Sequence, residues 1–157
     1  ETFPEYLDYI AGRKYAMDIG TQIPHSAVRN YVMGRRALTH EDATADDLAR
    51  MADIVEQGLL AGALGFSTSR TVGHRSILGE PIPGTFAEKA ELLAIAEAMK
   101  RANKGVFQAV PAGVVGALAG PEKYTTEQEV ELFAEVDIAV HGNSLAVSES
   151  YTGYLTQ

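Results

Sequence analysis

The stretch Gly62–Arg75, GALGFSTSRTVGHR, changes character at its midpoint. Its first half consists of small and apolar residues, which favour a buried strand near residues 63–67. Its second half brings together hydroxyl side chains, two arginines and a histidine. A buried strand that opens onto such a polar cluster is followed either by an ordinary solvated loop or by the mouth of a functional site.

The surrounding sequence repeats a helix-start signal at nearly constant spacing. In a capping box, Ser or Thr is followed three positions later by an acidic residue or Gln, and each side chain accepts a hydrogen bond from the other residue's amide. The pattern occurs at Thr2/Glu5, Thr44/Asp47, Thr85/Glu88 and Thr126/Glu129. Successive starts are 42, 41 and 41 residues apart, which predicts a repeated supersecondary unit.

A short apolar run follows each predicted helix, and this order predicts the fold class. We expect helices near residues 2–11, 45–60, 86–102 and 126–135, and strands near residues 15–23, 63–67, 105–110 and 137–141. The strand runs lack polar alternation, which indicates that both of their faces are covered. The pattern predicts an α/β fold in which parallel βα units form about half of a TIM-like (β/α)8 barrel. Residues 1–157 then form a single segment of that barrel, with no second domain.

Composition limits the class of protein. The chain has 157 residues, 46% of them hydrophobic, which suits one domain with its own core. Its net charge of −8 argues against nucleic-acid or membrane-surface partners. It has no cysteine, so disulfides and thiolate metal ligands are excluded. No apolar run approaches the ~20 residues of a membrane span, and we expect a cytoplasmic protein. Because the chain begins at Glu1, inside a helix-start signal, we expect an internal piece of a longer protein.

Polar residues gather where the predicted strands end. In barrels of this type, catalytic residues lie on the loops that follow the carboxyl ends of the strands. Here those positions carry His25, Ser67, Thr68, Arg70 and His141, with His74 a few residues further along the second loop. The polar half of the opening stretch therefore falls at the predicted catalytic rim.

Four blocks occur in a fixed order along the chain: PHSAVRNYVMG (Pro24–Gly34), GALGFSTSR (Gly62–Arg70), PIPGTFAEKAELLAIAEAM (Pro81–Met99) and GVFQ (Gly105–Gln108). Together they resemble the N-acyl-D-amino-acid deacylases, the D-aminoacylase-like branch of the amidohydrolase superfamily. The resemblance covers residues 1–108. It implies a metal-dependent barrel hydrolase that cleaves amide C–N bonds in small N-acyl amino acids, usually with zinc as the cofactor.

The resemblance also implies which parts of the catalytic site this chain holds. The family's His-x-His motif and its late aspartate, the general base, fall outside the sequence. Val110 stands where the family commonly has a metal-binding histidine, and valine cannot bind metal. His141 stands in a plausible position for the next histidine ligand, its alternative being a loop residue at a strand end. We therefore expect the chain alone to be inactive.

Each remaining candidate residue has a functional and a structural interpretation. His25 can act in catalysis as acid, base or ligand, or form an ordinary hydrogen bond in a loop. Arg70 can bind a substrate carboxylate with both guanidinium nitrogens, or pair with an acidic residue at the rim. Ser67 and Thr68 can orient substrate or satisfy amides at the strand end. His74 can contact a substrate carboxylate or be solvated.

Two classes of function stay open from the sequence. The first is the amidohydrolase described above, with an N-acyl amino acid as its substrate and no nucleic-acid or membrane partner. The second is a non-catalytic protein that keeps the barrel scaffold and binds a small acidic ligand. Because half a barrel leaves two open sheet edges, a homo-oligomer that covers those edges is a further expectation.

Overall fold

The fold is built on a sheet of three parallel strands, which lie side by side in the order in which they occur along the chain. The computed structural model describes residues 2–112 and 126–141. Its elements are α1 (Phe3–Ala11), β1 (Ile23–Pro24), α2 (His25–Met33), α3 (Arg35–Leu38), α4 (Ala45–Leu60), β2 (Gly65–Ser69), α5 (Lys89–Ala102), β3 (Val106–Val110) and α6 (Thr126–His141). The central strand β2 pairs with β1 on one side and with β3 on the other, both parallel. The predicted strand direction is therefore confirmed.

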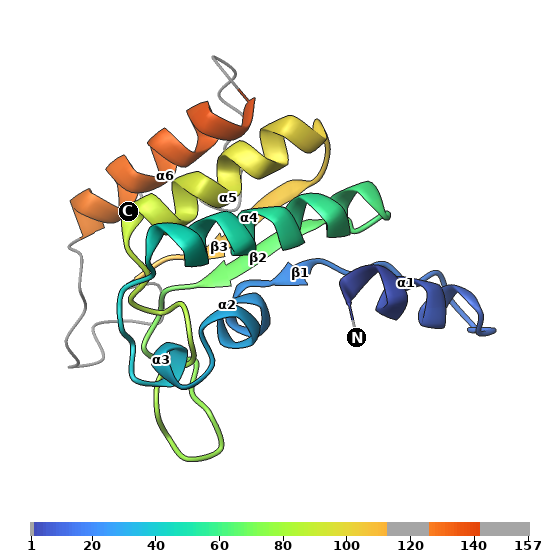
Figure 1. Ribbon diagram of the computed structural model, residues 1–157, viewed down its shortest axis with the longest axis horizontal. Helices are drawn as coiled ribbons and strands as arrows, with labels where there is room; N and C mark the ends of the chain where they lie inside the picture. The colour runs from blue at the N-terminus through green and yellow to red at the C-terminus, as the bar shows by residue number, and fades with distance from the viewer. Residues whose placement is uncertain (1, 113–125, 142–157) are drawn as a thin grey trace.

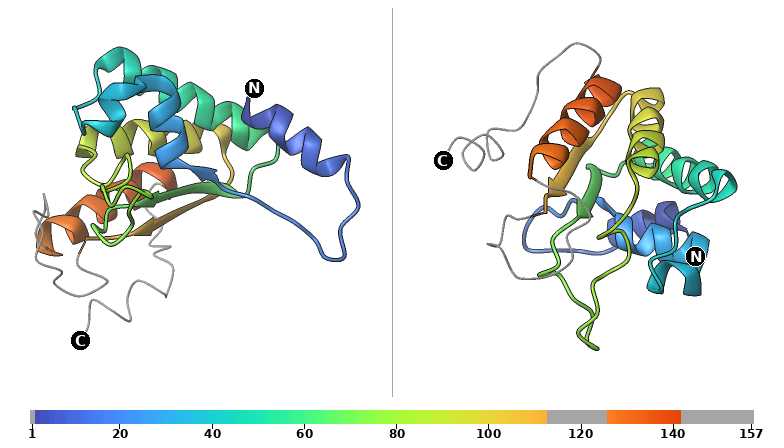
Figure 2. Two further views of the ribbon diagram at one scale, coloured as in Figure 1. Left: turned by 90° about the horizontal axis from the view of Figure 1, so that it is seen from below. Right: turned by 90° about the vertical axis from the view of Figure 1, so that its left-hand side faces the viewer.

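The helices α4, α5 and α6 lie side by side over one face of the sheet (Figures 1 and 2). Phe66 of β2 and Phe107 of β3 face this layer and pack among its apolar side chains. A doubly wound sheet carries helices on both faces, whereas a barrel carries them on the outer face alone. Successive strands begin 42 and 41 residues apart, as the repeat predicts. The predicted α/β fold of parallel βα units, in the arrangement of about half a barrel, is confirmed.

The second face of the sheet is not covered by these helices. Side chains alternate between the two faces of a strand, so Ser67 and Ser69 of β2 lie on the face opposite Phe66. In β3 the same face carries Val106, which is 57% exposed, and Gln108, which is also exposed. We call this surface the open face of the sheet. In a barrel it corresponds to the interior surface.

Local capping interactions fix the beginnings of α1 and α4. Thr2 with Glu5 and Thr44 with Asp47 form complete capping boxes, so both predicted helix starts are confirmed. In α4, Met51, Val55 and Leu59 are fully buried and form one apolar stripe. No helix within residues 2–112 and 126–141 is both long and apolar enough to cross a membrane.

The predicted strand over residues 15–23 is wrong except at its last residue. Tyr15, Met17 and Ile19 are 45%, 76% and 48% exposed, whereas Ile23 is fully buried. Only Ile23 and Pro24 pair with β2. The apolar residues of the earlier stretch have no core to enter, and the chain there runs as an irregular loop.

The third predicted helix begins later than the sequence pattern indicates. The capping box at Thr85/Glu88 is not formed, because the Thr85 amide, which would donate to Glu88, donates with the Thr85 hydroxyl to the carbonyl of Ile82 in a tight turn. The helix α5 starts at Lys89, and its N-cap Glu88 makes no side-chain capping bond. Because the amides of this turn are hydrogen-bonded within the turn itself, the helix begins after it.

The fourth predicted strand, residues 137–141, is also wrong. These residues belong to α6, which extends beyond the expected end at residue 135. Leu132 and Val136 are buried against Leu92 and Ala96 of α5, and Val140 packs at the edge of the same cluster. Their spacing of four residues continues a helical stripe, which an apolar run of this length does not distinguish from a strand.

Asp47 gives a test of the α4 cap. Its buried carboxylate accepts hydrogen bonds from the amide and hydroxyl of Thr44 and from two nitrogens of Arg36. The bonds from Arg36, followed by those from Thr44, outweigh burial and hold the pKa of Asp47 well below its usual range. A depressed folded-state pKa adds stability above the unfolded-state pKa of about 3.9, and this stability is lost as the pH falls towards the folded value.

We therefore expect Asp47→Asn to lower the free energy of unfolding at pH 7 by about 1–2 kcal/mol. The difference from wild type should shrink as the pH falls below about 4, because the wild-type carboxylate is then protonated in the unfolded chain. Urea unfolding followed by circular dichroism at several pH values measures both effects. Asp46→Asn, at an exposed neighbouring position, is the control. Equal losses for the two variants would contradict this role of Asp47.

Candidate functional site

The two faces of the sheet separate the predicted site residues. Thr68 and Arg70 follow Phe66 at steps of two and are buried on the helix-covered side, where they are 5% and 3% exposed. Ser67 lies between Phe66 and Thr68 in sequence and faces the open side. Residues that the sequence groups into one cluster therefore contribute to two different environments.

His25 is the first residue of α2 and lies in a buried polar network. Its Nδ1 is 2.7 Å from the hydroxyl oxygen of Thr68, and its Nε2 is 2.7 Å from Oε1 of Glu91 in α5. The same carboxylate oxygen accepts a hydrogen bond of 2.8 Å from Nε of Arg29. We call these four residues the His25 network. It ties the end of β1 and the start of α2 to the middle of the sheet and to α5.

The His25 network contains an ion pair between Arg29 and Glu91. Burial alone raises the pKa of Glu91, but the hydrogen bonds from His25 and Arg29 and the positive charge of Arg29 outweigh burial and lower the pKa below its ordinary value. The ionised carboxylate can only accept, so Nε2 of His25 donates to it. Nδ1 then accepts from the Thr68 hydroxyl if the ring is neutral, or donates to it if the ring is protonated. The other carboxylate oxygen of Glu91, Oε2, is buried without a hydrogen-bond partner in the described part of the chain.

The ring of His25 is enclosed on two sides. The ring of Phe66 lies at a centroid distance of 5.3 Å. Gly84 covers it from the loop before α5, so closely that a Cβ built on Gly84 would lie 2.7 Å from Nδ1. Gly84 also has a φ of +97°, which residues with a Cβ rarely adopt. A ring enclosed in this way can stabilise the packing at the end of the sheet. The predicted catalytic role of His25 stays a prediction.

Arg70 forms a second buried pair. Its Nε donates to both carboxylate oxygens of Glu129 in α6, at 2.7 and 3.0 Å, and its Nη1 donates to the carbonyl of Ala87 at 2.8 Å. The amide of Ala112 also donates to Glu129, at 3.3 Å. The structure therefore shows an arginine–acid pair at the rim, which is one of the two interpretations that the sequence left open. In this arrangement the guanidinium is directed into the protein.

His74 lies apart from both buried pairs. It is exposed in the loop after β2, and its Nδ1 is 2.6 Å from the hydroxyl oxygen of Ser69. That loop extends away from the helix layer (Figure 1). The structure thus places His74 and Ser67 on the solvent-accessible side of the strand end. His25, Thr68 and Arg70 are buried on the helix-covered side.

The zinc site implied by the sequence resemblance is not formed by the described residues. No group of three His, Asp or Glu side chains in residues 2–112 and 126–141 is close enough to hold a metal ion. Val110 is the last residue of β3 and pairs with Ser69 across the sheet. His141 is the last residue of α6, and its side chain lies outside the described part.

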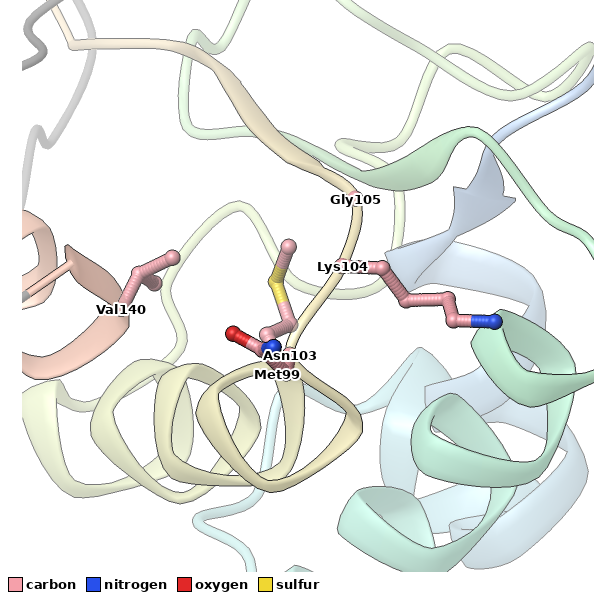
Figure 3. A pocket seen from close by; sticks show the side chains of 5 residues that line it. All are labelled: Met99, Asn103, Lys104, Gly105 and Val140. Atoms are coloured by element: carbon pink, nitrogen blue, oxygen red, sulfur yellow. The ribbon is translucent and has the colours of Figure 1, made fainter.

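Two pockets lie at the opposite end of the sheet from these polar residues. One, of about 130 Å³, is lined by Met99, Asn103, Lys104, Gly105 and Val140 next to the beginning of β3. In Figure 3 the side chain of Lys104 extends away from Val140. The other, of about 250 Å³, lies between α1 and the residues that precede β2. Ligand sites of parallel α/β sheets lie at the carboxyl ends of the strands, so neither pocket is the candidate site.

Three partners in the buried pairs were missed by the sequence analysis: Arg29, Glu91 and Glu129. A usable signal was present in their helical phase. Glu91 shares a helix face with Ile95, and Glu129 with Leu132 and Val136, so both acids fall on faces that are otherwise apolar. A charged residue in phase with a buried stripe indicates a buried partner.

The Arg70–Glu129 pair makes a direct stability test. Removing one partner of a buried ion pair leaves a charge without compensation, which costs about 3–5 kcal/mol. We expect Arg70→Ala to lower the free energy of unfolding by about that amount, and Arg70→Met combined with Glu129→Leu to recover most of it. Arg50→Ala, at an exposed position of α4, is the control. Urea unfolding measures all three, and an Arg70→Ala variant as stable as wild type would contradict a structural role.

Comparison with known proteins supplies the family. A model of the amidohydrolase family matches residues 1–156, which is nearly the whole chain. Searches of curated proteins and of solved structures found no match. The matched range includes all three strands, the helices over them and both buried ion pairs. The chain belongs to the amidohydrolase family.

Proposed function

We propose that the protein hydrolyses the amide C–N bond of N-acyl-D-amino acids, in the manner of the D-aminoacylase-like branch. Membership of the amidohydrolase family supports hydrolase activity. The observation that carries the finer proposal is the ordered set of four sequence blocks within residues 24–108, which resemble that branch. The structure adds that these blocks include the end of β1, the whole of β2 and the first three residues of β3, and that the carboxyl ends of these parallel strands lie at the same end of the sheet.

The open face offers chemistry suited to a substrate with an amide and a carboxylate. Ser67 of β2 and Gln108 of β3 are directly opposite each other in the parallel register. A hydroxyl and a primary amide can each donate and accept hydrogen bonds, so they can bind both the carbonyl and the N–H of an acyl amide. In this proposal they help to orient the substrate, and further residues of the catalytic site are contributed by parts of the protein outside the described ranges.

The contacts of Arg70 limit the alternative of a non-catalytic protein that binds a small acidic ligand. That alternative depended on the cationic cluster after β2. Arg70, the buried arginine of that cluster, is already paired with Glu129, so its guanidinium binds a carboxylate of the protein itself. No specific observation favours the alternative over the hydrolase.

The activity test compares enantiomers. The protein expressed from its complete gene should release free amino acid from N-acetyl-D-amino acids at least about tenfold faster than from the L-enantiomers, a difference of about 1.4 kcal/mol in the barrier. Chromatographic detection of the released amino acid measures both rates, with and without added zinc. Hydrolysis of neither enantiomer would contradict the proposal, and preference for the L-form would remove the D-specific branch while leaving the family unchanged.

A further inference from the structure

Ser69 occupies a distinctive position on the open face. It is the last residue of β2, so its hydroxyl lies at the carboxyl end of the central strand, on the face that helices α4, α5 and α6 leave uncovered. Its side chain is partly accessible to solvent. This end of a parallel sheet is where α/β proteins place reacting groups.

The hydroxyl of Ser69 is paired with an imidazole. Nδ1 of His74 lies 2.6 Å from the Ser69 oxygen, which is within the range expected for a nucleophile and its general base. In the tautomer with the proton on Nε2, Nδ1 is the acceptor and the serine hydroxyl is the donor. Ser67, two residues earlier on the same face, makes no hydrogen bond to a histidine in the described chain, and it therefore provides an internal comparison.

The backbone holds His74 in place beside the strand. Thr71 and Val72, which are buried, anchor the chain immediately after Arg70. The amide of His74 donates to the carbonyl of Thr71, and the carbonyl of His74 accepts from the amide of Ile82. An antiparallel bridge between Arg75 and Pro81 continues this pairing. The imidazole is thus carried by a short hairpin-like loop whose base is fixed, which favours a persistent contact with Ser69.

We propose that Ser69 is a nucleophile activated by His74, and that it accepts an acyl group from activated esters. In this reaction the Ser69 oxygen forms a bond to the acyl carbonyl carbon as the bond from that carbon to the leaving oxygen breaks. The leaving group departs with the electron pair, and the serine proton passes to Nδ1 of His74 and then to solvent. The reaction requires no metal and is distinct from the amide hydrolysis proposed above.

The test uses p-nitrophenyl acetate and the purified chain in the presence of a chelator. Wild type should release p-nitrophenolate and, after acid quenching, carry an acetyl group on Ser69 that peptide mapping by mass spectrometry identifies. Ser69→Ala should abolish this adduct, and the control Ser76→Ala, at an exposed serine of the loop that follows β2, should retain it. His74→Gln should slow acylation of Ser69 by about 100-fold, the lower end of the usual contribution of a general base. Circular dichroism checks that each variant keeps its fold.

Three results would overturn the proposal. The first is acetylation confined to lysines or to the terminal amine in the wild-type chain, which is decisive without any variant. The second is equal acylation of Ser67 and Ser69, and the third is an unchanged rate at Ser69 in the His74→Gln variant. Because the chelator is present throughout, these outcomes are independent of whether the protein hydrolyses N-acyl amino acids.

Discussion

A carboxylate buried between a helix and a sheet needs a positive or hydrogen-bonding partner where it lies, and this requirement organises the carboxyl end of the sheet. Glu91 of α5 is held by His25 and Arg29 from α2, and Glu129 of α6 is held by Arg70 after β2. Each pair joins a helix to a segment that adjoins a strand end. Such pairs add little net stability compared with apolar packing, but they permit few alternative arrangements. Their main effect here is to fix where α2, α5 and α6 sit on the sheet.

This arrangement changes how the polar residues at the end of β2 are interpreted. From the sequence, hydroxyls, arginines and histidines in one short stretch indicate a single rim cluster. The strand geometry divides them, with Thr68 and Arg70 on the helix-covered side and Ser67 and Ser69 on the open face. Thr68 and Arg70 make buried polar contacts with His25 and Glu129. Ser67 and Ser69, with Gln108 opposite Ser67, are accessible to solvent on the open face.

How well each feature could be predicted from the sequence depended on how far apart its interacting residues lie in the chain. The starts of α1 and α4 were predictable because their capping boxes involve residues three positions apart. The strands β2 and β3 were predictable from short apolar runs, and their order from the repeat. The prediction of a strand at residues 137–141 was wrong because the apolar residues of this run belong to a helix that packs on α5. The partners of Arg70 and His25 lie 59 and 66 residues away in the sequence, and no local pattern could pair them.

Gly84 has a consequence for how this sequence can vary. Because its backbone lies against the His25 ring, the two positions share one volume. A larger residue at 84 would need a smaller one at 25, yet the loss of the imidazole would remove a donor from the buried carboxylate of Glu91. A larger residue at position 84 would therefore require substitutions at positions 25 and 91 as well. A chain with only one or two of these three substitutions would lose either the packing around the ring or the hydrogen bond to the buried carboxylate. Positions 25, 84 and 91 are thus expected to behave as one inherited unit, resistant to stepwise drift even if none of them touches a substrate.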